Sequence, residues 1–216
     1  MAASELHLAV LSIAGSDPSG GAGLQSDLRT FALHGLFGCA VVTALTVQGS
    51  DRVRRTQAVD ALLVEEQLEA VLAEGSVAAI KTVMLANAEI VAAVARTLLR
   101  SGAGIPLVVD PVMVSSSGSE LLDSQGVVTM REQLLPLATV VTPNLDEAGV
   151  LLGRGPIDAD GAELAARELA ALFGCCVVVK GGHSLGEYAV DHVGLAAGPG
   201  QQLHSMRLEA PWVDTV

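Results

Sequence analysis

Glycine and small polar residues are concentrated in one short stretch near the start of the chain, from Gly15 to Gly23. This turn lies between an apolar segment typical of a strand and a segment with helical spacing that opens at Leu24. Backbone with few side chains lets a small ligand approach main-chain groups, and open α/β sheets bind ligands where strands end and helices begin. The stretch therefore predicts the floor of a small-molecule site. The alternative is that its glycines only form a tight strand–helix connection.

Two phosphate-binding motifs can be compared with this stretch. The segment from Gly21 to Ser26 approaches the dinucleotide fingerprint G-x-G-x-x-G/A, but Ser26 stands at the third glycine position. No acidic residue ends the next predicted strand near Thr46, so NAD binding is only weakly indicated. The chain contains no Gly-Lys-Ser/Thr sequence, which excludes a Walker A loop.

Asn144 and Glu147 stand at the start of a predicted helix, directly after Thr142-Pro143. They can form a capping box, or their oxygens can hold a hydrated magnesium ion through water. Asp110 has the same two interpretations: it can cap a turn before Pro111 or add negative charge to a metal site. Both interpretations stay open for all three residues.

Lys180 closes the apolar run from Cys175 to Val179 and precedes two glycines. Its ammonium group can extend to solvent, or it can neutralise the oxygens of a transferred phosphate. Lys81 can pair with a nearby carboxylate, and His183 can be a surface loop residue. Cys175 and Cys176 are predicted to be core residues.

Short β-branched runs alternate with longer segments of helical periodicity, which predicts a doubly wound, mostly parallel sheet with helices on both faces. The predicted strands are 6–14, 39–46, 78–82, 106–111, 138–142 and 175–180. The predicted helices are 23–34, 64–74, 88–100, 124–134, 144–152 and 161–173. Looser alternation at 188–196 and 202–209 predicts a late antiparallel hairpin, and the basic segment 52–55 is expected to be a solvated loop.

The candidate residues follow the carboxyl ends of six different predicted strands. They are the turn 15–23, Gln48, the segment 81–84, Asp110, the pair Asn144 and Glu147, and the segment 180–183. Since these ends meet at one edge of a parallel sheet, we expect a single ligand site there.

Composition narrows the class of protein. The 216 residues show no shift that would mark a second domain, so one domain over 1–216 is expected. A formal net charge of -12 disfavours nucleic-acid and membrane partners. The longest apolar stretch, 169–179, is far shorter than the roughly 20 residues that span a bilayer. Without a secretion signal, and with three cysteines in no disulfide or zinc pattern, a cytoplasmic location is expected.

Taken together, five segments of the chain resemble the hydroxymethylpyrimidine/phosphomethylpyrimidine kinases of thiamine biosynthesis. The segments are 14–28, 43–48, 109–113, 142–148 and 179–183, and the resemblance runs from about Leu8 to Thr215. It implies a ribokinase-like fold and ATP-dependent phosphorylation of 4-amino-5-hydroxymethyl-2-methylpyrimidine, followed by phosphorylation of its monophosphate. It also implies ATP and Mg²⁺ as cofactors and a homodimer as the assembly.

The resemblance also implies residue roles. Gln48 would hydrogen-bond the aminopyrimidine edge, and the ring would be surrounded by Gly15, Ala22, Asp27, Met84 and Val112. Asn144 and Glu147 would organise magnesium through water, and Thr142 would contact the nucleotide. Asp110 would lie near the phosphates, and Lys180 would steady the transferred group.

The chain departs from the family pattern in two places. Val83 stands where the family usually has glycine, and this branched side chain can narrow or shift the pyrimidine pocket, or have little effect on it if the side chain points into the core. In the family, the segment matching 213–215 leads into Asn-Thr-His-Gly-Thr-Gly-Cys, whereas this chain ends at Val216. A C-terminal truncation is the expected explanation. The alternative functions are a non-catalytic pyrimidine-binding relative and a pyridoxal-type vitamin kinase.

Overall fold

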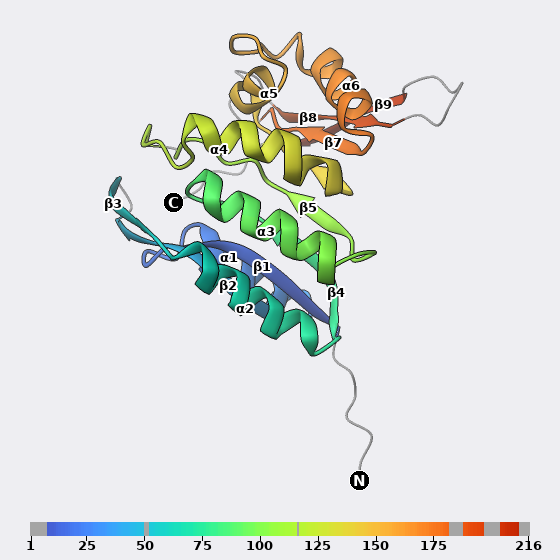
Figure 1. Ribbon diagram of the computed structural model, residues 1–216. Coiled ribbons are helices and arrows are strands. Elements are labelled where there is room, and N and C mark those ends of the chain that lie inside the picture. The colour runs from blue at the N-terminus through green and yellow to red at the C-terminus, as the bar shows by residue number, and fades with distance from the viewer. Residues whose placement is uncertain (1–7, 50–51, 116, 182–187, 197–203, 212–216) are drawn as a thin grey trace. The chain divides into compact units, whose positions relative to one another are not determined.

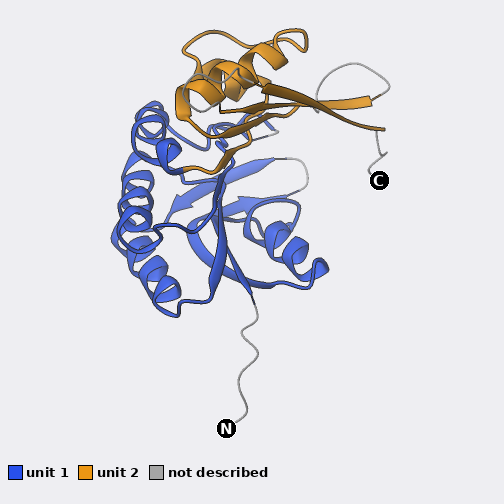
Figure 2. Ribbon diagram, turned by 90° about the vertical axis from the view of Figure 1, so that its right-hand side faces the viewer, with its two compact units in different colours: residues 1–137 blue, residues 138–216 orange. Residues whose placement is uncertain are grey.

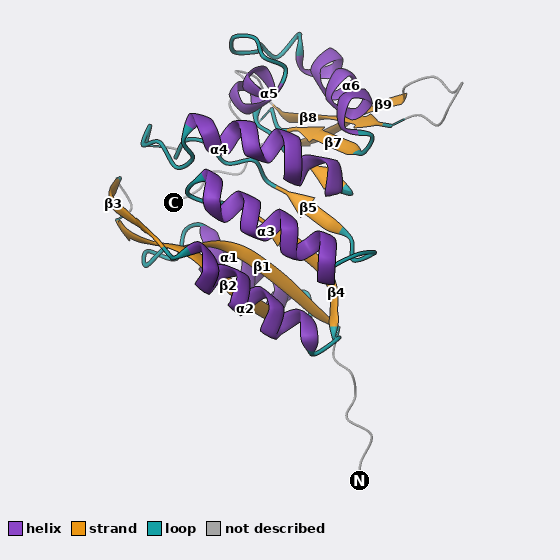
Figure 3. Cartoon of the chain, in the orientation of Figure 1, coloured by secondary structure: helices purple, strands orange, loops and turns teal. Residues whose placement is uncertain are grey.

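The computed structural model describes residues 8–49, 52–115, 117–181, 188–196 and 204–211. The chain divides into two compact units, residues 1–137 and residues 138–216 (Figure 2). Strands and helices alternate along most of the first unit, whereas the second unit places two successive helices between its first strand and its last three (Figure 3). The expected single domain over 1–216 stays a prediction.

The described strands of the first unit lie in the order β3-β2-β1-β4-β5. Its strands are β1 (Ala9–Ser16), β2 (Phe37–Gln48), β3 (Val53–Ala58), β4 (Val77–Thr82) and β5 (Leu107–Val109). β1 pairs in parallel with both β2 and β4, and β4 pairs in parallel with β5. β3 runs antiparallel to β2 at the edge of this sheet. The predicted solvated loop at 52–55 is therefore wrong in part, because residues from Val53 onward form a strand, although an exposed one.

Helices cover both faces of this sheet (Figures 1 and 2). On β4, Lys81 contacts Asp27 of α1 (Gly23–Leu33), whereas its neighbour Ile80 lines a cavity together with Leu98 of α3 (Ala88–Ser101). Because successive side chains of a strand point to opposite faces, α1 and α3 lie on opposite sides of the sheet. The expected doubly wound arrangement is confirmed for this unit.

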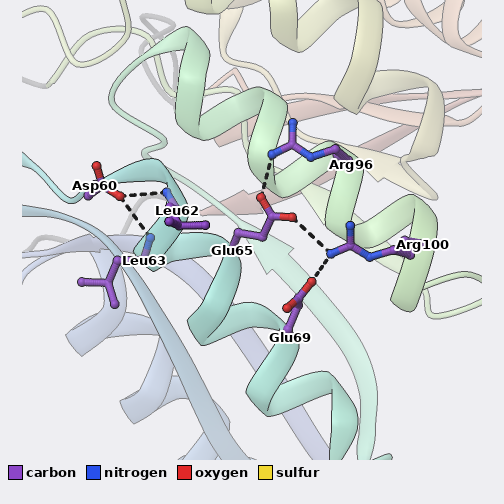
Figure 4. A network of polar contacts seen from close by, with 7 residues as sticks. All are labelled: Asp60, Leu62, Leu63, Glu65, Glu69, Arg96 and Arg100. Atoms are coloured by element: carbon purple, nitrogen blue, oxygen red, sulfur yellow. Dashed lines mark hydrogen bonds and ion pairs between the residues drawn. The ribbon is translucent and has the colours of Figure 1, made fainter.

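α2 (Ala61–Ala73) packs beside α3 and is joined to it by a network of charged side chains (Figure 4). Glu65 accepts hydrogen bonds from Arg96 at 2.6 Å and from Arg100 at 3.1 Å, and Arg100 also contacts Glu69. The hydrogen bonds from these two arginines lower the pKa of Glu65.

α2 begins three residues earlier than predicted. Asp60 caps the helix, since its carboxylate accepts hydrogen bonds from the amides of Leu62 and Leu63. Both leucines are exposed, so they lie outside the apolar stripe on which the sequence prediction depended.

The remaining helical segment of the first unit follows β5. The helix predicted over 124–134 is present but changes its winding: α4 (Ser124–Thr129) continues as a π-helical turn, η1 (Met130–Leu134), and a 3₁₀ turn, η2 (Leu135–Leu137). Met130, Leu134 and Leu135 are fully buried, so the π-helical turn and the residue that follows it contribute side chains to the core.

The second unit contains four strands in the order β6-β7-β8-β9. Its elements are β6 (Val140–Val141), α5 (Leu145–Leu151), α6 (Ala162–Phe173), β7 (Cys176–Val179), β8 (Tyr188–Leu195) and β9 (His204–Pro211). β6 and β7 are parallel, and β8 is antiparallel to both β7 and β9. The predicted late hairpin is confirmed.

Small residues set the helix–sheet distance in this unit. A Cβ atom added to Gly194 of β8 would lie 2.2 Å from the carbonyl oxygen of Ala166 in α6. Cys175 is buried as predicted, and Cys176 is half-buried. Burial, together with a smaller effect of Cys176, raises the pKa of the Cys175 thiol to about 11.

Candidate active site

The turn from Gly15 to Gly23 closes tightly on itself. A Cβ atom added to Gly23 would lie 2.3 Å from the carbonyl oxygen of Gly15, and the φ of Gly23 is +58°. Only glycine fits there, because a side chain would meet backbone and would also adopt the left-handed conformation that it disfavours. The turn therefore brings the end of β1 against the first residue of α1.

Asp17 organises the interior of this turn. Its carboxylate accepts hydrogen bonds from the amide and hydroxyl of Ser19 at 2.8 Å and from the amide of Ala22 at 2.9 Å. Burial by itself would raise the pKa of Asp17, but the hydrogen bonds from Ser19, Ala22 and Gly21 outweigh it and hold this pKa below its ordinary value of 3.8. Asp17 is thus an ionised group that fixes the backbone around Ala22.

Gln48 lies at the carboxyl end of β2, beside the same turn. The hydroxyl of Thr46 lies 3.0 Å from the carbonyl oxygen of Ser16 and 3.5 Å from Oε1 of Gln48. Ser16 is further held by Gln25, whose side-chain amide donates to its hydroxyl at 2.8 Å. The structure therefore brings Gln48 and the turn together, with Thr46 between them.

Met84 closes another side of this region. It is buried just beyond β4, and its sulfur would lie 3.0 Å from a Cβ atom on Gly15. Its carbonyl oxygen accepts a hydrogen bond from the hydroxyl of Thr43 in β2 at 2.6 Å. Val83 is half-buried, and its effect on a ligand pocket stays a prediction.

Asp27 makes contacts inside the first unit, and its contact with the pyrimidine ring stays a prediction. Its two carboxylate oxygens are already engaged, one by Nζ of Lys81 at 2.6 Å and the other by the hydroxyl of Ser12 at 2.6 Å. The structural interpretation of Lys81, pairing with a carboxylate, is confirmed.

Asp110 and Val112 follow the end of β5 in the same unit. The amide of Asp110 donates to the carbonyl oxygen of Thr82 at 2.9 Å, and the amide of Val112 donates to the carbonyl oxygen of Asp110 at 2.9 Å. Both residues are half-buried. Asp110 is thereby held at the carboxyl end of the parallel strands β4 and β5.

Asn144 and Glu147 form the capping box that the sequence permits. The amide of Glu147 donates to Oδ1 of Asn144, and the amide of Asn144 donates to Oε2 of Glu147, both at 2.8 Å. Glu147 is 5% exposed. Capping and magnesium binding are compatible, because each accepting oxygen has a second lone pair.

Lys180 lies directly beside Asn144. Its amide donates to the carbonyl oxygen of Pro143 at 2.8 Å, and Asn144 and Lys180 form an isolated parallel bridge. The following residue must be glycine, since a Cβ atom on Gly181 would lie 1.9 Å from the carbonyl oxygen of Val190. The structure therefore brings Asn144, Glu147 and Lys180 together within the second unit, and half-buried Thr142 lies two residues before Asn144.

Some expectations are untested by this geometry. The meeting of the first-unit residues with those of the second unit stays a prediction. His183 and the segment 213–215 lie outside the described residues.

Within the described residues, no group of three or more His, Cys, Asp or Glu side chains is placed to hold a metal ion. No helix in the described part of the chain is long and apolar enough to cross a membrane.

Two residues that organise this region were not singled out from the sequence. Asp17 could have been found, because Asp-Pro-Ser-Gly is typical of a turn in which the Asp side chain accepts from the backbone. Thr46 had no such signal, since its position between Ser16 and Gln48 depends on the pairing of β1 with β2.

Comparison with solved structures defines the class of protein. A crystal structure of phosphomethylpyrimidine kinase from Clostridium difficile 630 is 35% identical, with a TM-score of 0.79, and covers 92% of this chain and 83% of its own. An ADP complex of Bacillus subtilis pyridoxal kinase is 33% identical, with a TM-score of 0.82, over 97% of this chain and 76% of its own. The fold is that of the ribokinase-like α/β kinases.

The sequence comparison is more specific. The pattern of the phosphomethylpyrimidine kinase family matches residues 17–213, and the chain belongs to that family. A hydroxymethylpyrimidine/phosphomethylpyrimidine kinase of Mycobacterium bovis is 49% identical over 174 residues, or 81% of this chain. The chain spans 63% of the length of that curated relative.

Proposed function

We propose that the chain carries the activity of a hydroxymethylpyrimidine/phosphomethylpyrimidine kinase. The substrates are 4-amino-5-hydroxymethyl-2-methylpyrimidine and its monophosphate, and ATP is the phosphoryl donor. The observation that carries the proposal is the 49% identity with a kinase of that name, together with a family match from residue 17 to residue 213. The geometry around Gln48 supports it.

On the substrate side, the side-chain amide of Gln48 supplies a donor and an acceptor, which matches the aminopyrimidine edge with its ring nitrogen and amino group. The hydroxyl of Thr46 lies 3.5 Å from Oε1 of Gln48. Gly15, Ala22, Met84 and Val112 surround the ring. Gly15 carries no side chain between the ring and the sulfur of Met84.

Asp27 of α1 binds Ser12 of β1 and Lys81 of β4, and so fixes the start of α1 against the sheet. Asp27 thereby positions the turn, and in our proposal it also borders the pyrimidine ring, because each of its oxygens keeps a second lone pair.

In the transfer itself, the hydroxymethyl oxygen forms a bond to the γ-phosphorus of ATP, the bond from that phosphorus to the β,γ-bridging oxygen breaks, and ADP leaves. The hydroxyl proton is released, and in the second round a phosphate oxygen of the monophosphate is the nucleophile. Phosphoryl transfer is accelerated chiefly by positioning and by neutralising charge.

Lys180 suits the neutralising role, because its ammonium is a compact positive charge. Asn144 and Glu147 provide oxygen atoms, the kind of ligand that Mg²⁺ prefers. These oxygens would hold the ion through its water molecules. The bound ion would supply charge compensation for the ATP phosphates. Thr142 and Asp110 are proposed to lie near the nucleotide. The ADP complex of the Bacillus subtilis relative supports nucleotide binding.

The test is a kinase assay of the protein with ATP, Mg²⁺ and the pyrimidine alcohol, in which mono- and diphosphate products are measured by mass spectrometry. Gln48→Leu is expected to raise KM for the alcohol by about tenfold or more, because a pyrimidine polar group loses its partner. Gln57→Leu is the matched control, since Gln57 is an exposed glutamine on the adjacent strand. Absence of phosphorylated pyrimidine would refute the proposed activity.

A second candidate is phosphorylation of pyridoxal, favoured by the TM-score of 0.82 with a pyridoxal kinase. A competition assay with equal concentrations of the two alcohols separates the candidates by which product forms first. Binding of the pyrimidine without any turnover would instead favour a non-catalytic relative. A homodimer and a cytoplasmic location stay predictions.

A further inference from the structure

The hairpin formed by β2 and β3 is basic, although the protein as a whole is acidic. Arg52, Arg54 and Arg55 fall within four residues of a chain that has 12 basic and 24 acidic residues. In the same unit, Arg29 of α1 donates to the carbonyl oxygen of Gly20 in the turn. Three arginines therefore lie on the hairpin that also carries Gln48.

Arg54 has a special position in this hairpin. β2 and β3 pair Val47 with Arg55 and Gln48 with Val53, so Arg54 is the extra residue of a β-bulge next to Gln48. Bulges interrupt the alternation of a strand and redirect a side chain, often beside a ligand site.

The two exposed arginines of β3 differ in their contacts. Arg55 donates to Oε1 of Gln57 at 3.0 Å. Arg54 is exposed and, among the residues that the structure describes, forms no hydrogen bond or ion pair through its guanidinium. Arg54 therefore offers an exposed, fully charged group that can bind two oxygens at once, on a bulge whose backbone adjoins that of Gln48.

The described carboxylates of the turn and of α1 do not offset the charge of Arg54. Asp17 is enclosed by the hydrogen bonds of its own turn, and Asp27 is paired with Lys81. Arg54 therefore presents positive charge that no carboxylate on the turn or on α1 neutralises.

The chemistry of the proposed substrate supplies an anion for this group. The 4-amino group, which Gln48 would contact, and the 5-hydroxymethyl group lie on adjacent ring carbons. Once the alcohol is phosphorylated, its phosphate lies next to the edge that Gln48 binds. We propose that Arg54 binds this phosphate and so favours the monophosphate over the free alcohol. The inference rests on the proposed function and names Arg54 as its specificity-determining residue.

The experiment is calorimetric titration of the protein with the monophosphate and, separately, with the alcohol. Arg54→Ala is expected to lower the ratio of the two affinities, monophosphate over alcohol, by about tenfold, the effect of losing one charge-assisted contact. Arg54→Lys should restore part of the ratio. Arg55→Ala is the matched control and should leave the ratio unchanged.

Several results would overturn the inference. An equal fall of the ratio in Arg54→Ala and Arg55→Ala would indicate only the general field of a basic hairpin. A fall in the affinity for the ATP analogue AMP-PCP with no change in the ratio would assign Arg54 to the nucleotide. An unchanged ratio accompanied by aggregation would show that the arginine protects an exposed edge strand.

The same titrations separate this inference from the proposed function. Selective binding of the monophosphate without phosphorylation of either pyrimidine would reject the activity and retain the phosphate-binding role of Arg54. Normal phosphorylation together with an unchanged affinity ratio in Arg54→Ala would reject the role of Arg54 alone.

Discussion

Lys81 and Asp27 form an ion pair between β4 and α1, with the lysine Nζ 2.6 Å from Oδ1 of the aspartate. The side chain of Asp27 is 10% exposed and that of Lys81 is 31% exposed. The charge of the aspartate is therefore compensated mainly by its partner, whereas the ammonium of the lysine is also compensated by water.

This asymmetry predicts unequal effects of two neutral substitutions. Lys81→Met is expected to lower the free energy of unfolding by about 1–3 kcal/mol. Of the two groups that bind the nearly buried carboxylate of Asp27, Lys81 and Ser12, the variant leaves only Ser12. Asp27→Asn should cost less, because the amide still accepts from Ser12 and Lys81 can turn toward water. Urea unfolding of both variants measures the difference, and a larger loss for Asp27→Asn would contradict the expectation.

Gly23 allows a second prediction, with Gly35 as its control. Both glycines have positive φ, +58° and +72°, but a Cβ atom on Gly35 would meet nothing within 4 Å. Gly35→Ala is expected to cost about 1–2 kcal/mol, the conformational term alone. Gly23→Ala should cost at least about 1–3 kcal/mol more, because its Cβ atom would overlap the carbonyl oxygen of Gly15. Equal losses in urea unfolding would show that the turn adjusts without strain.

The capping box allows the structural and catalytic roles of Glu147 to be separated. Asn144→Ala is expected to destabilise the protein by about 1 kcal/mol through loss of the cap. Glu147→Gln should keep the stability nearly unchanged, since glutamine also completes a capping box. If Glu147 organises magnesium, the same variant needs more Mg²⁺ for half-maximal kinase activity. Unaltered Mg²⁺ dependence would restrict Glu147 to its structural role.

Asp17 makes stability depend on pH in a defined direction. Its folded-state pKa lies below the ordinary value of 3.8, so its ionised form stabilises the fold above about pH 4. This contribution is lost as the pH falls below 3.8 and through the lower pKa of the folded state. The difference in unfolding free energy between the wild type and Asp17→Asn should therefore be largest near neutral pH and shrink on acidification. A difference that stays constant between pH 7 and pH 3 would contradict this assignment.

The cysteines are expected to react slowly with alkylating reagents in the native protein. Burial raises the pKa of Cys39, Cys175 and Cys176, and Cys175 reaches about 11. Because the thiolate is the reactive form, Cys175 should be labelled most slowly by iodoacetamide at pH 8, and unfolding in urea should remove the difference. Peptide mass spectrometry after timed labelling gives the three rates. Rapid labelling of native Cys175 would contradict its buried position.

Most of the strand–helix order was predictable because the apolar periodicity of each segment is local. The exception is β3, whose residues Val53 to Ala58 are almost all polar or small and show no apolar alternation. This strand is stabilised by main-chain hydrogen bonds to β2 and by its position at an edge, neither of which leaves a hydrophobic pattern in the sequence. The early start of α2 was indicated by Asp60, but the exposed Leu62 and Leu63 concealed it.

Sequence alone determined most of the elements, the glycine turn and the family, because these depend on local spacing and on residue types in a fixed order, whereas β3 shows no such spacing. Tertiary structure decided the partners of individual side chains. Lys81 could pair with any nearby carboxylate, and the register of β1 and β4, which sets Ser12 opposite Lys81, brings both residues to Asp27. Arg54 was one of three arginines in a presumed loop until the bulge set it apart from Arg55. Contacts between strands distant in sequence depend on register, and a one-residue shift of register exchanges the faces of a strand.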